Sequence, residues 1–220
     1  SPVLSIDREG DKWRLKVAGG VVRAEKVILA TNGYTGNLFP SLRQTIIPLR
    51  STHLATTVLG DNVARSILPG NHGLSDTRQA LWAFRKDRFG RIVTTSAPVF
   101  TTGARDRMTT STIKRLNIAF PQIERPEIEY VWEGIIAMTY ERLPRYHELA
   151  GGIIAALGYS GRGIALGTAV GRMMAERALG KPASELALPA VPLKPWPMHD
   201  LVVPFSRTMA WYFKWRDSRD

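Results

Sequence analysis

The segment Gly158-Tyr159-Ser160-Gly161-Arg162-Gly163 combines three glycines with the expected start of a helix at about Ile164. An apolar strand predicted over Ile153–Leu157 runs directly into it. The glycines let the backbone approach a ligand closely, and the first N–H groups of a helix carry partial positive charge. This combination favours an anion or an electron-rich carbonyl. A tight strand-to-helix turn without a ligand is the alternative.

A second candidate segment is the apolar run Lys26–Thr31, which ends in the turn dipeptide Asn32-Gly33. A short continuous apolar run predicts a strand that is covered on both faces. In open α/β sheets, ligands bind beyond the carboxyl ends of the strands, which is where Thr31 to Gly33 would lie. A plain turn is again the alternative.

The composition argues against several other chemistries. The chain of 220 residues has no cysteine, which excludes disulfides, thiolate metal sites and cysteine-linked cofactors on it and fits a cytoplasmic protein. Its four histidines stand far apart without metal-ligand spacing, so no metal site is expected. No uncharged apolar run is long enough to span a membrane.

The formal net charge of +11 is consistent with a polyanionic partner such as nucleic acid. However, the 30 lysines and arginines are distributed along the chain rather than clustered. This pattern favours a basic surface, or a face that docks an acidic partner, over nucleic-acid binding.

The elements that must position these segments fall into four stretches, 1–41, 42–136, 137–180 and 181–220. The first reads as a β-meander followed by the buried strand. The second has short strands, predicted over 45–49, 53–58, 80–84, 91–95 and 128–134, with a helix over 109–120. The third returns to a buried strand, the glycine turn and a helix. The pattern predicts an α/β (α+β) protein with an antiparallel module inserted between two parts of one layer.

Two helices carry further patterns. Glycines 163, 167 and 171 recur every four residues and give the helix after the turn a flat side. We predict that this side packs closely against a sheet. After a proline-rich extended segment from Lys181 to Pro204, residues 205–216 predict a short aromatic and basic helix. We expect it to dock on the body of the protein or on a second chain; an interfacial membrane anchor is the alternative.

Taken together, the motifs resemble a known family. The segments VILATNGYTG (27–36), IIPLRSTHLATT (46–57), LWAFRKDRFGRIV (81–93), WEGIIAMTYERLPRYHEL (132–149) and AALGYSGRGIALGTAVGRMMAE (155–176) resemble the FAD-dependent D-amino-acid oxidase superfamily. The closest resemblance is to its gamma-glutamylputrescine oxidase, glycine oxidase and sarcosine oxidase branch. It covers nearly the whole chain in the same order.

The resemblance implies a Rossmann-type FAD-binding domain, incomplete here, with an inserted antiparallel substrate domain. It implies oxidation of a carbon–nitrogen bond in an amine or amino acid, without assigning a catalytic side chain. The cofactor-facing positions implied are Thr31, Asn32, Gly33, Gly158, Tyr159, Ser160, Gly161, Arg162, Gly163 and Ile164. The candidate substrate contacts are Arg50, Trp82, Phe84, Arg85, Trp132 and Arg142, the arginines being suited to a carboxylate.

The chain also departs from the family pattern. It has no strand–GxGxxG–helix segment for the FAD pyrophosphate, and residues 139–144 read TYERLP where many members have T-x-D-x-x-P. We therefore expect a C-terminal portion or a subunit that does not retain FAD alone and acts with a missing N-terminal half or partner subunit. A non-catalytic binding module that has lost the nucleotide-binding half is the alternative.

Overall fold

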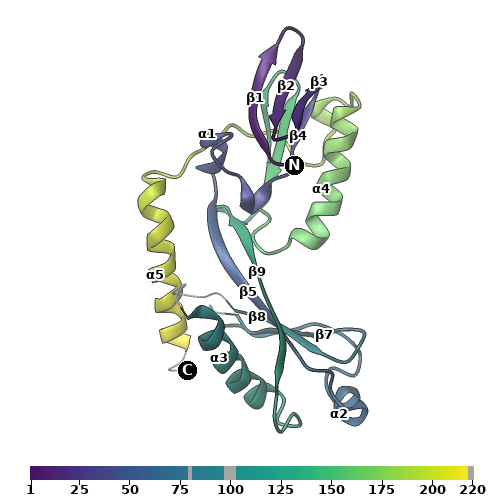
Figure 1. The fold of residues 1–220 in the computed structure, drawn as a ribbon, viewed down its shortest axis with the longest axis vertical. Coiled ribbons are helices and arrows are strands. Elements are labelled where there is room, and N and C mark those ends of the chain that lie inside the picture. The colour runs from purple at the N-terminus through teal and green to yellow at the C-terminus, as the bar shows by residue number, and fades with distance from the viewer. Residues whose placement is uncertain (79–80, 97–102, 218–220) are drawn as a thin grey trace. The chain divides into compact units, whose positions relative to one another are not determined.

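The computed structural model describes residues 1–78, 81–96 and 103–217. The chain forms two compact units (Figure 1). Unit 1 consists of Ser1–Leu49 and Ile135–Val203, and unit 2 of Arg50–Gly134 and Pro204–Asp220. Both contain strands and helices, which confirms the predicted mixed α/β class.

Unit 1 begins with an antiparallel meander. Its strands are β1 (Val3–Glu9), β2 (Lys12–Val17) and β3 (Gly20–Ala24), in the order β1-β2-β3. Gly10, with φ of +63°, lies in the first turn, and Gly20, with φ of +154°, begins β3 directly after the second. The three strands were predicted over 3–6, 13–17 and 21–24, and β1 extends three residues beyond its predicted end into the expected turn at 8–11.

The second sheet of unit 1 has the order β10-β11-β4. Strand β11 (Ile153–Leu157) pairs antiparallel with β10 (Arg145–Ala150) and parallel with β4 (Val27–Leu29). On one face, Val27, Leu29 and Ile153 pack with Trp13 and Leu15 of the meander. On the other, helix α4 (Gly163–Ala178) covers Ile154 and Ala156.

Short elements and the proline-rich segment complete unit 1. They are the 3-10 turns η1 (Asn32–Tyr34) and η2 (Ala183–Glu185) and the short helix α1 (Pro40–Arg43). The segment after η2 runs beside β10, where Val191 donates to the Tyr146 carbonyl at 2.9 Å.

The sheet of unit 2 has the order β6-β7-β8-β5-β9. Its strands are β5 (Ile47–Thr56), β6 (Leu74–Ser75), β7 (Ala83–Lys86), β8 (Ile92–Ser96) and β9 (Ile128–Met138), of which β5 and β9 extend into unit 1. The unit also contains α2 (Asp61–Ser66) and α3 (Ala104–Ala119). Leu116 of α3 packs with Phe84, Ile92 and Phe120 to form the core.

Several predicted boundaries in unit 2 and at the C-terminus were wrong. The strands expected over 45–49 and 53–58 form one strand, β5, because Ser51 and Thr52 are buried and bond Thr95 and Glu133 rather than making a loop. The tail helix, α5 (His199–Asp217), begins six residues before the expected 205. The Met198 carbonyl starts it by accepting the N–H groups of Leu201 and Val202. Part of the expected 80–84 strand lies outside the described residues.

Two predictions about burial in unit 1 were also wrong. Ile28 was expected to be covered, yet 43% of it is exposed, because α4 lies over β10 and β11 and does not cover β4. The glycine side of α4 was expected to pack on the sheet. Val170, Met173 and Met174 pack there instead, and a Cβ added at Gly167 or Gly171 would meet nothing within 4 Å.

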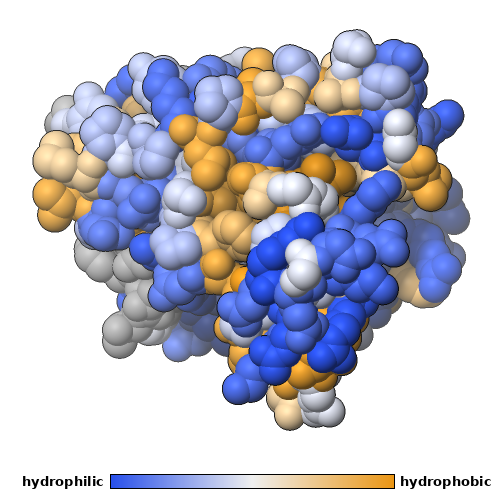
Figure 2. Space-filling view, turned by 90° about the horizontal axis from the view of Figure 1, so that it is seen from above, coloured by the Kyte–Doolittle hydropathy of each residue, from blue (hydrophilic) through white to orange (hydrophobic). Residues whose placement is uncertain are grey.

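Apolar side chains are also exposed elsewhere. Figure 2 shows one face of the molecule on which hydrophilic residues predominate and apolar patches lie between them. The part of the chain that the structure describes has no helix long and apolar enough to cross a membrane.

Candidate functional site

Three segments of unit 1 meet where the parallel strands β4 and β11 end. Residues 30–35 follow β4, residues 158–163 follow β11, and residues 139–144 follow β9. Hydrogen bonds join the second segment to each of the other two. Since parallel strands place their carboxyl ends at one edge, both glycine-containing segments reach the position where α/β sheets bind ligands.

Asn32 links the ends of the two strands. Its backbone has φ of +42°, a left-handed conformation that asparagine tolerates better than most residues. Its side-chain Oδ1 accepts a hydrogen bond from the N–H of Gly158 at 3.0 Å. The same contact leaves the Asn32 amide group, a donor of two hydrogen bonds, at the edge of the site.

Two glycines are required by close packing. A Cβ at Gly33 would lie 2.4 Å from the carbonyl oxygen of Ile135. A Cβ at Gly158, where φ is +83°, would lie 2.2 Å from Cγ2 of Thr139. Gly161 differs, because its φ is +90° but nothing lies within 4 Å of an added Cβ. The first two glycines hold the segments together, and the third leaves open space on the outer side of the turn.

The turn ends at the N-terminus of α4. Ser160 has φ of +51°, and its N–H donates to the Ala137 carbonyl at 3.1 Å. Arg162 is the N-cap residue and its side chain makes no capping hydrogen bond. The first-turn N–H groups of α4 therefore have neither an acceptor within the helix nor a side-chain cap, and they can bind an anion or a carbonyl oxygen.

The third segment, Thr139–Pro144, was noted in the sequence only for its departure from the family pattern. Thr139 Oγ1 donates to the Leu143 carbonyl at 2.8 Å, and the Arg142 carbonyl accepts from Nη1 of Arg162 at 3.5 Å. Arg142 has φ of +58° and an exposed side chain. No periodicity in the sequence indicates these contacts, since they depend on strands β9 and β11 ending together.

Large apolar side chains are exposed at this edge. Tyr34, Tyr140 and Ile164 are 67%, 75% and 90% exposed. Tyr159, in the glycine turn, is half buried, and burial raises the pKa of its phenol. The edge thus offers apolar side chains beside uncapped N–H groups, which suits a planar ring that carries an electron-rich carbonyl group.

The candidate cofactor residues and Arg142 are therefore together in unit 1, whereas the other five candidates belong to unit 2. Phe84 is only 4% exposed and packs edge-on against Phe120, with ring centroids 5.1 Å apart. This position gives Phe84 a core role and argues against its expected contact with a substrate. Arg85, its neighbour on β7, is exposed.

The remaining three candidates of unit 2 already have partners. Arg50 forms an ion pair with Glu133, with Nη1 and Oε2 2.6 Å apart. Trp82 is partly buried, and the guanidinium of Arg78 lies 4.2 Å from its ring centroid. Trp132 stacks on His53, with ring centroids 5.5 Å apart, and burial lowers the pKa of His53. A substrate would have to displace or share these contacts.

Comparison with known protein families identifies the family of the chain. Residues 1–177 match the model of the FAD dependent oxidoreductase family, abbreviated DAO. The chain is 31% identical over 194 residues to a probable oxidoreductase OrdL from Rhizobium meliloti, covering 86% of this chain and 45% of the relative. It is 30% identical over 205 residues to gamma-glutamylputrescine oxidoreductase from Escherichia coli, covering 92% of this chain and 48% of the relative.

Solved structures show the same fold. Glycine oxidase from Bacillus cereus matches with a TM-score of 0.66 at 22% identity, covering 85% of this chain and 51% of that one. L-proline dehydrogenase from P. horikoshii matches with a TM-score of 0.65 at 19% identity, with the same coverage. The chain thus spans about half the length of the relatives it matches. Over that half, the chain belongs to the family of FAD-dependent oxidoreductases.

Proposed function

We propose that this chain is the C-terminal portion, or a subunit, of an enzyme that oxidises a carbon–nitrogen bond in an amine or amino acid with FAD. The observation that carries the proposal is the uncapped N-terminus of α4 behind the glycine turn, tied to Asn32 at the ends of β4 and β11. In a member of the FAD-dependent family, this arrangement would bind the ring of the cofactor rather than its pyrophosphate.

The residues at this edge fit the ring end of the cofactor. A cradle of close-packed glycines, at 33 and 158, keeps side chains out of the turn, and the open side of Gly161 leaves room for a ligand. The first-turn N–H groups of α4 would stabilise negative charge on a ring carbonyl oxygen. The exposed Tyr34, Tyr140 and Ile164 would exclude water from the ring.

The cofactor, when bound, would supply the hydride acceptor for oxidation of the amine. The residues of this chain would orient the substrate and keep the site dry. Arg142 is the best-placed candidate for a substrate carboxylate, because its side chain is exposed and it lies in the segment that contacts the glycine turn. Arg50, Trp82, Arg85 and Trp132 remain substrate-contact proposals in unit 2, and Phe84 is no longer one.

The proposal includes the domain organisation and the partner. Residues 1–41 and 137–180 would form part of the FAD-binding domain, and 42–136 the substrate domain, followed by the 181–220 extension. The missing half of the relatives' length would supply the pyrophosphate-binding segment, so the isolated chain would not retain FAD. The absence of cysteine supports a cytoplasmic location.

The experiment is to purify the protein in the form in which its cells make it, together with whatever polypeptide completes it. The preparation should show a flavin absorbance spectrum. It should bleach anaerobically with at least one member of a panel comprising gamma-glutamylputrescine, glycine and L-proline, chosen from the names of the relatives. A colourless preparation that takes up no added FAD would overturn the proposal.

A non-catalytic binding module is the second candidate, because the chain spans only about half of its relatives. It predicts that the purified protein carries no flavin and that no amine in the panel is consumed. The same experiment therefore separates the two functions.

A further inference from the structure

Helix α5, yellow in Figure 1, carries large apolar side chains that stay exposed. Five of them, all after Pro204, are between 38% and 61% exposed: Phe205, Met209, Trp211, Tyr212 and Trp215. Single exposed apolar side chains are common on proteins, but a group of them marks a surface that meets a partner. The tail helix therefore offers an interaction surface that the proposed function leaves unexplained.

These five side chains share one side of the helix. At about 100° per residue, their positions fall within an arc of about 160°, with Tyr212 near its centre. The rings of Tyr212 and Trp215 are neighbours, with centroids 6.1 Å apart. Ser206 and Phe213, which are half buried, fall on the opposite side. We call the exposed arc the apolar face of α5.

Basic residues border this face. Positions 207 and 214, an arginine and a lysine, fall within about 60° of Trp211 around the helix. Arg216, which is exposed, lies near the other border. Asp217 is the one acidic residue of this part of the helix, and the formal net charge of the whole chain is +11. The surroundings of the apolar face therefore favour an anionic partner.

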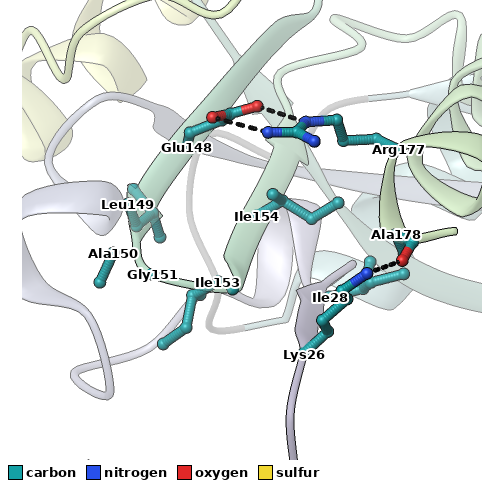
Figure 3. Close-up of a pocket in the computed structure, with 11 residues that line it drawn as sticks. Lys26, Ile28, Glu148, Leu149, Ala150, Gly151, Ile153, Ile154, Arg177 and Ala178 are labelled. Carbon is teal, nitrogen blue, oxygen red and sulfur yellow. Dashed lines mark hydrogen bonds and ion pairs between the residues drawn. The ribbon is translucent and has the colours of Figure 1, made fainter. Parts of the chain in front are cut away.

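The pocket in Figure 3 provides a contrast, because its basic side chains are held by partners within the chain. It has a volume of about 380 Å³ and is lined by Lys26 and Arg177. Lys26 Nζ donates to the Ala178 carbonyl, and Arg177 Nε lies 2.7 Å from Oε1 of Glu148. The residues that line this pocket include no aromatic side chain. It therefore lacks the combination of exposed rings and a basic border that α5 has.

The width of the apolar face indicates what kind of partner fits. A helix that pairs with another helix uses a narrow seam of about two positions in seven. The apolar face of α5 is wider, and the rings of Trp211, Tyr212 and Trp215 each combine an apolar body with a polar group. Such rings favour the boundary between lipid headgroups and acyl chains, and basic residues beside them are attracted to anionic headgroups. A flat anionic surface therefore fits better than a second helix.

We propose that α5 lies on an anionic lipid bilayer, with its axis parallel to the surface and its apolar face at the level of the headgroups. One face of one helix and three basic residues give weak, reversible binding, as is usual for interfacial helices. This inference goes beyond the proposed function and does not depend on it, because it uses no residue of the candidate site.

The test is co-sedimentation with vesicles of the purified protein, together with whatever polypeptide completes it. Phosphatidylcholine vesicles that contain about one third phosphatidylglycerol should bind it, and vesicles of phosphatidylcholine alone should bind it about tenfold more weakly. Raising the salt from about 0.1 M to about 1 M should release most of the protein. Equal binding to the two kinds of vesicle, or no binding to either, overturns the proposal.

Matched pairs of aromatic residues show whether α5 makes the contact. Phe205→Ser combined with Tyr212→Ser should weaken vesicle binding about tenfold, because two rings are removed from the apolar face. Phe89→Ser combined with Tyr130→Ser is the control, since those rings are 55% and 51% exposed and lie outside α5. The control should bind like the unsubstituted protein. Equal losses in the two double variants contradict a contact through α5.

A fluorescent label covers the case in which a substitution disturbs folding. Because the chain has no cysteine, Phe205→Cys and Phe89→Cys each introduce a single thiol for a nitrobenzoxadiazole label, and label taken up by the unsubstituted protein is subtracted. Emission at 205, and not at 89, should shift to shorter wavelength when anionic vesicles are added. No shift at 205 overturns the proposal. A label at 205 that is already shielded without vesicles also overturns it, because a second copy or the completing polypeptide then covers the face.

Discussion

The side-chain oxygen of Asn32 accepts the backbone N–H of Gly158 at 3.0 Å, across 126 positions of sequence. Asn32 lies three residues after the end of strand β4 and Gly158 directly follows β11, and the two strands are parallel neighbours. This hydrogen bond therefore helps to fix the glycine turn at 158–163 relative to the turn that follows β4. It also orients the N-terminus of α4, because Gly163 follows five residues after Gly158.

Replacing Asn32 tests this link. Asn32→Leu removes the acceptor and strands the buried Gly158 N–H, at a cost of about 1–3 kcal/mol of unfolding free energy. The left-handed backbone adds about 1–2 kcal/mol for a residue such as leucine. Asn32→Asp retains an acceptor oxygen and tolerates the backbone, so most of the stability should return. Urea denaturation of both variants measures the difference, and equal losses would show that the hydrogen bond is unimportant.

Gly33 and Gly36 make a matched pair for close packing. Alanine at 33 places its Cβ 2.4 Å from the Ile135 carbonyl oxygen, a backbone atom that no rotamer change can move. Alanine at 36 meets nothing within 4 Å. We expect Gly33→Ala to lose about 1–3 kcal/mol, as overpacked sites do, and Gly36→Ala to change little. Thermal unfolding provides the measurement. A tolerated alanine at 33 would mean that β9 and the first turn lie further apart.

The sequence could predict the elements whose patterns are local. Strand β2 of the meander alternates with period two, and the run around Val27 and the glycine turn each carry a strong local signal. Strand β10 was missed, because Arg145, His147 and Glu148 make it look polar although Tyr146 and His147 are buried. Burial of His147 depends on the segment carrying Val191, 44 positions later.

The candidate site was also predictable only in part, because some of its contacts join residues that are distant in sequence. The residues at 31–33 and 158–164 were predicted through the resemblance, and the structure brings those two segments together. Thr139 could not be foreseen, since its contact with Gly158 depends on strands from different parts of the chain ending at one edge. The exposure of Ile28 was likewise not predictable, because the sequence pattern of a strand does not reveal how far a helix from elsewhere in the chain covers it.

His147 predicts a pH dependence of stability. Burial lowers the pKa of its imidazole, although the hydrogen bond to the Val191 carbonyl at 2.7 Å opposes this shift. The unfolded chain, with the ordinary pKa of about 6.5, therefore binds the proton first as the pH falls. The contribution of His147 to the free energy of unfolding should be fully present above about pH 6.5. Below that pH it should decrease by at most about 1.4 kcal/mol per pH unit, until the pH falls below the pKa of His147 in the folded state.

The measurement is the urea midpoint between pH 8 and pH 5, compared with His147→Asn, which cannot titrate. The variant should show a shallower decrease. His53, whose pKa burial also lowers, contributes a residual slope of the same sign. An unchanged slope in His147→Asn would exclude His147 as a source of the pH dependence.

The open side of α4 at Gly167 and Gly171 leads us to expect a substitution that increases stability. Gly171 lies inside the helix with open space around an added Cβ. Gly171→Ala should therefore stabilise the isolated chain by about 0.5–1 kcal/mol through helix propensity. Val170→Ala, at the adjacent buried position, should destabilise it through lost packing. A loss of stability in Gly171→Ala, measured by thermal unfolding, would indicate that this side of α4 is packed.

A negative charge at the start of α4 should affect the stability of the helix and its proposed binding of FAD in opposite directions. Ile164 is 90% exposed, so Ile164→Asp sacrifices no packing, and its carboxylate complements the helix dipole by about 0.3–1 kcal/mol. In the completed flavoprotein the same carboxylate would repel negative charge on the ring, at on the order of 1 kcal/mol or about fivefold in FAD affinity. Ile164→Asn is the uncharged control. Weaker FAD retention in the aspartate variant alone, together with a more stable isolated chain, is the expected pair of results. Equal FAD affinity in both variants would mean that the N-terminus of α4 does not face the ring.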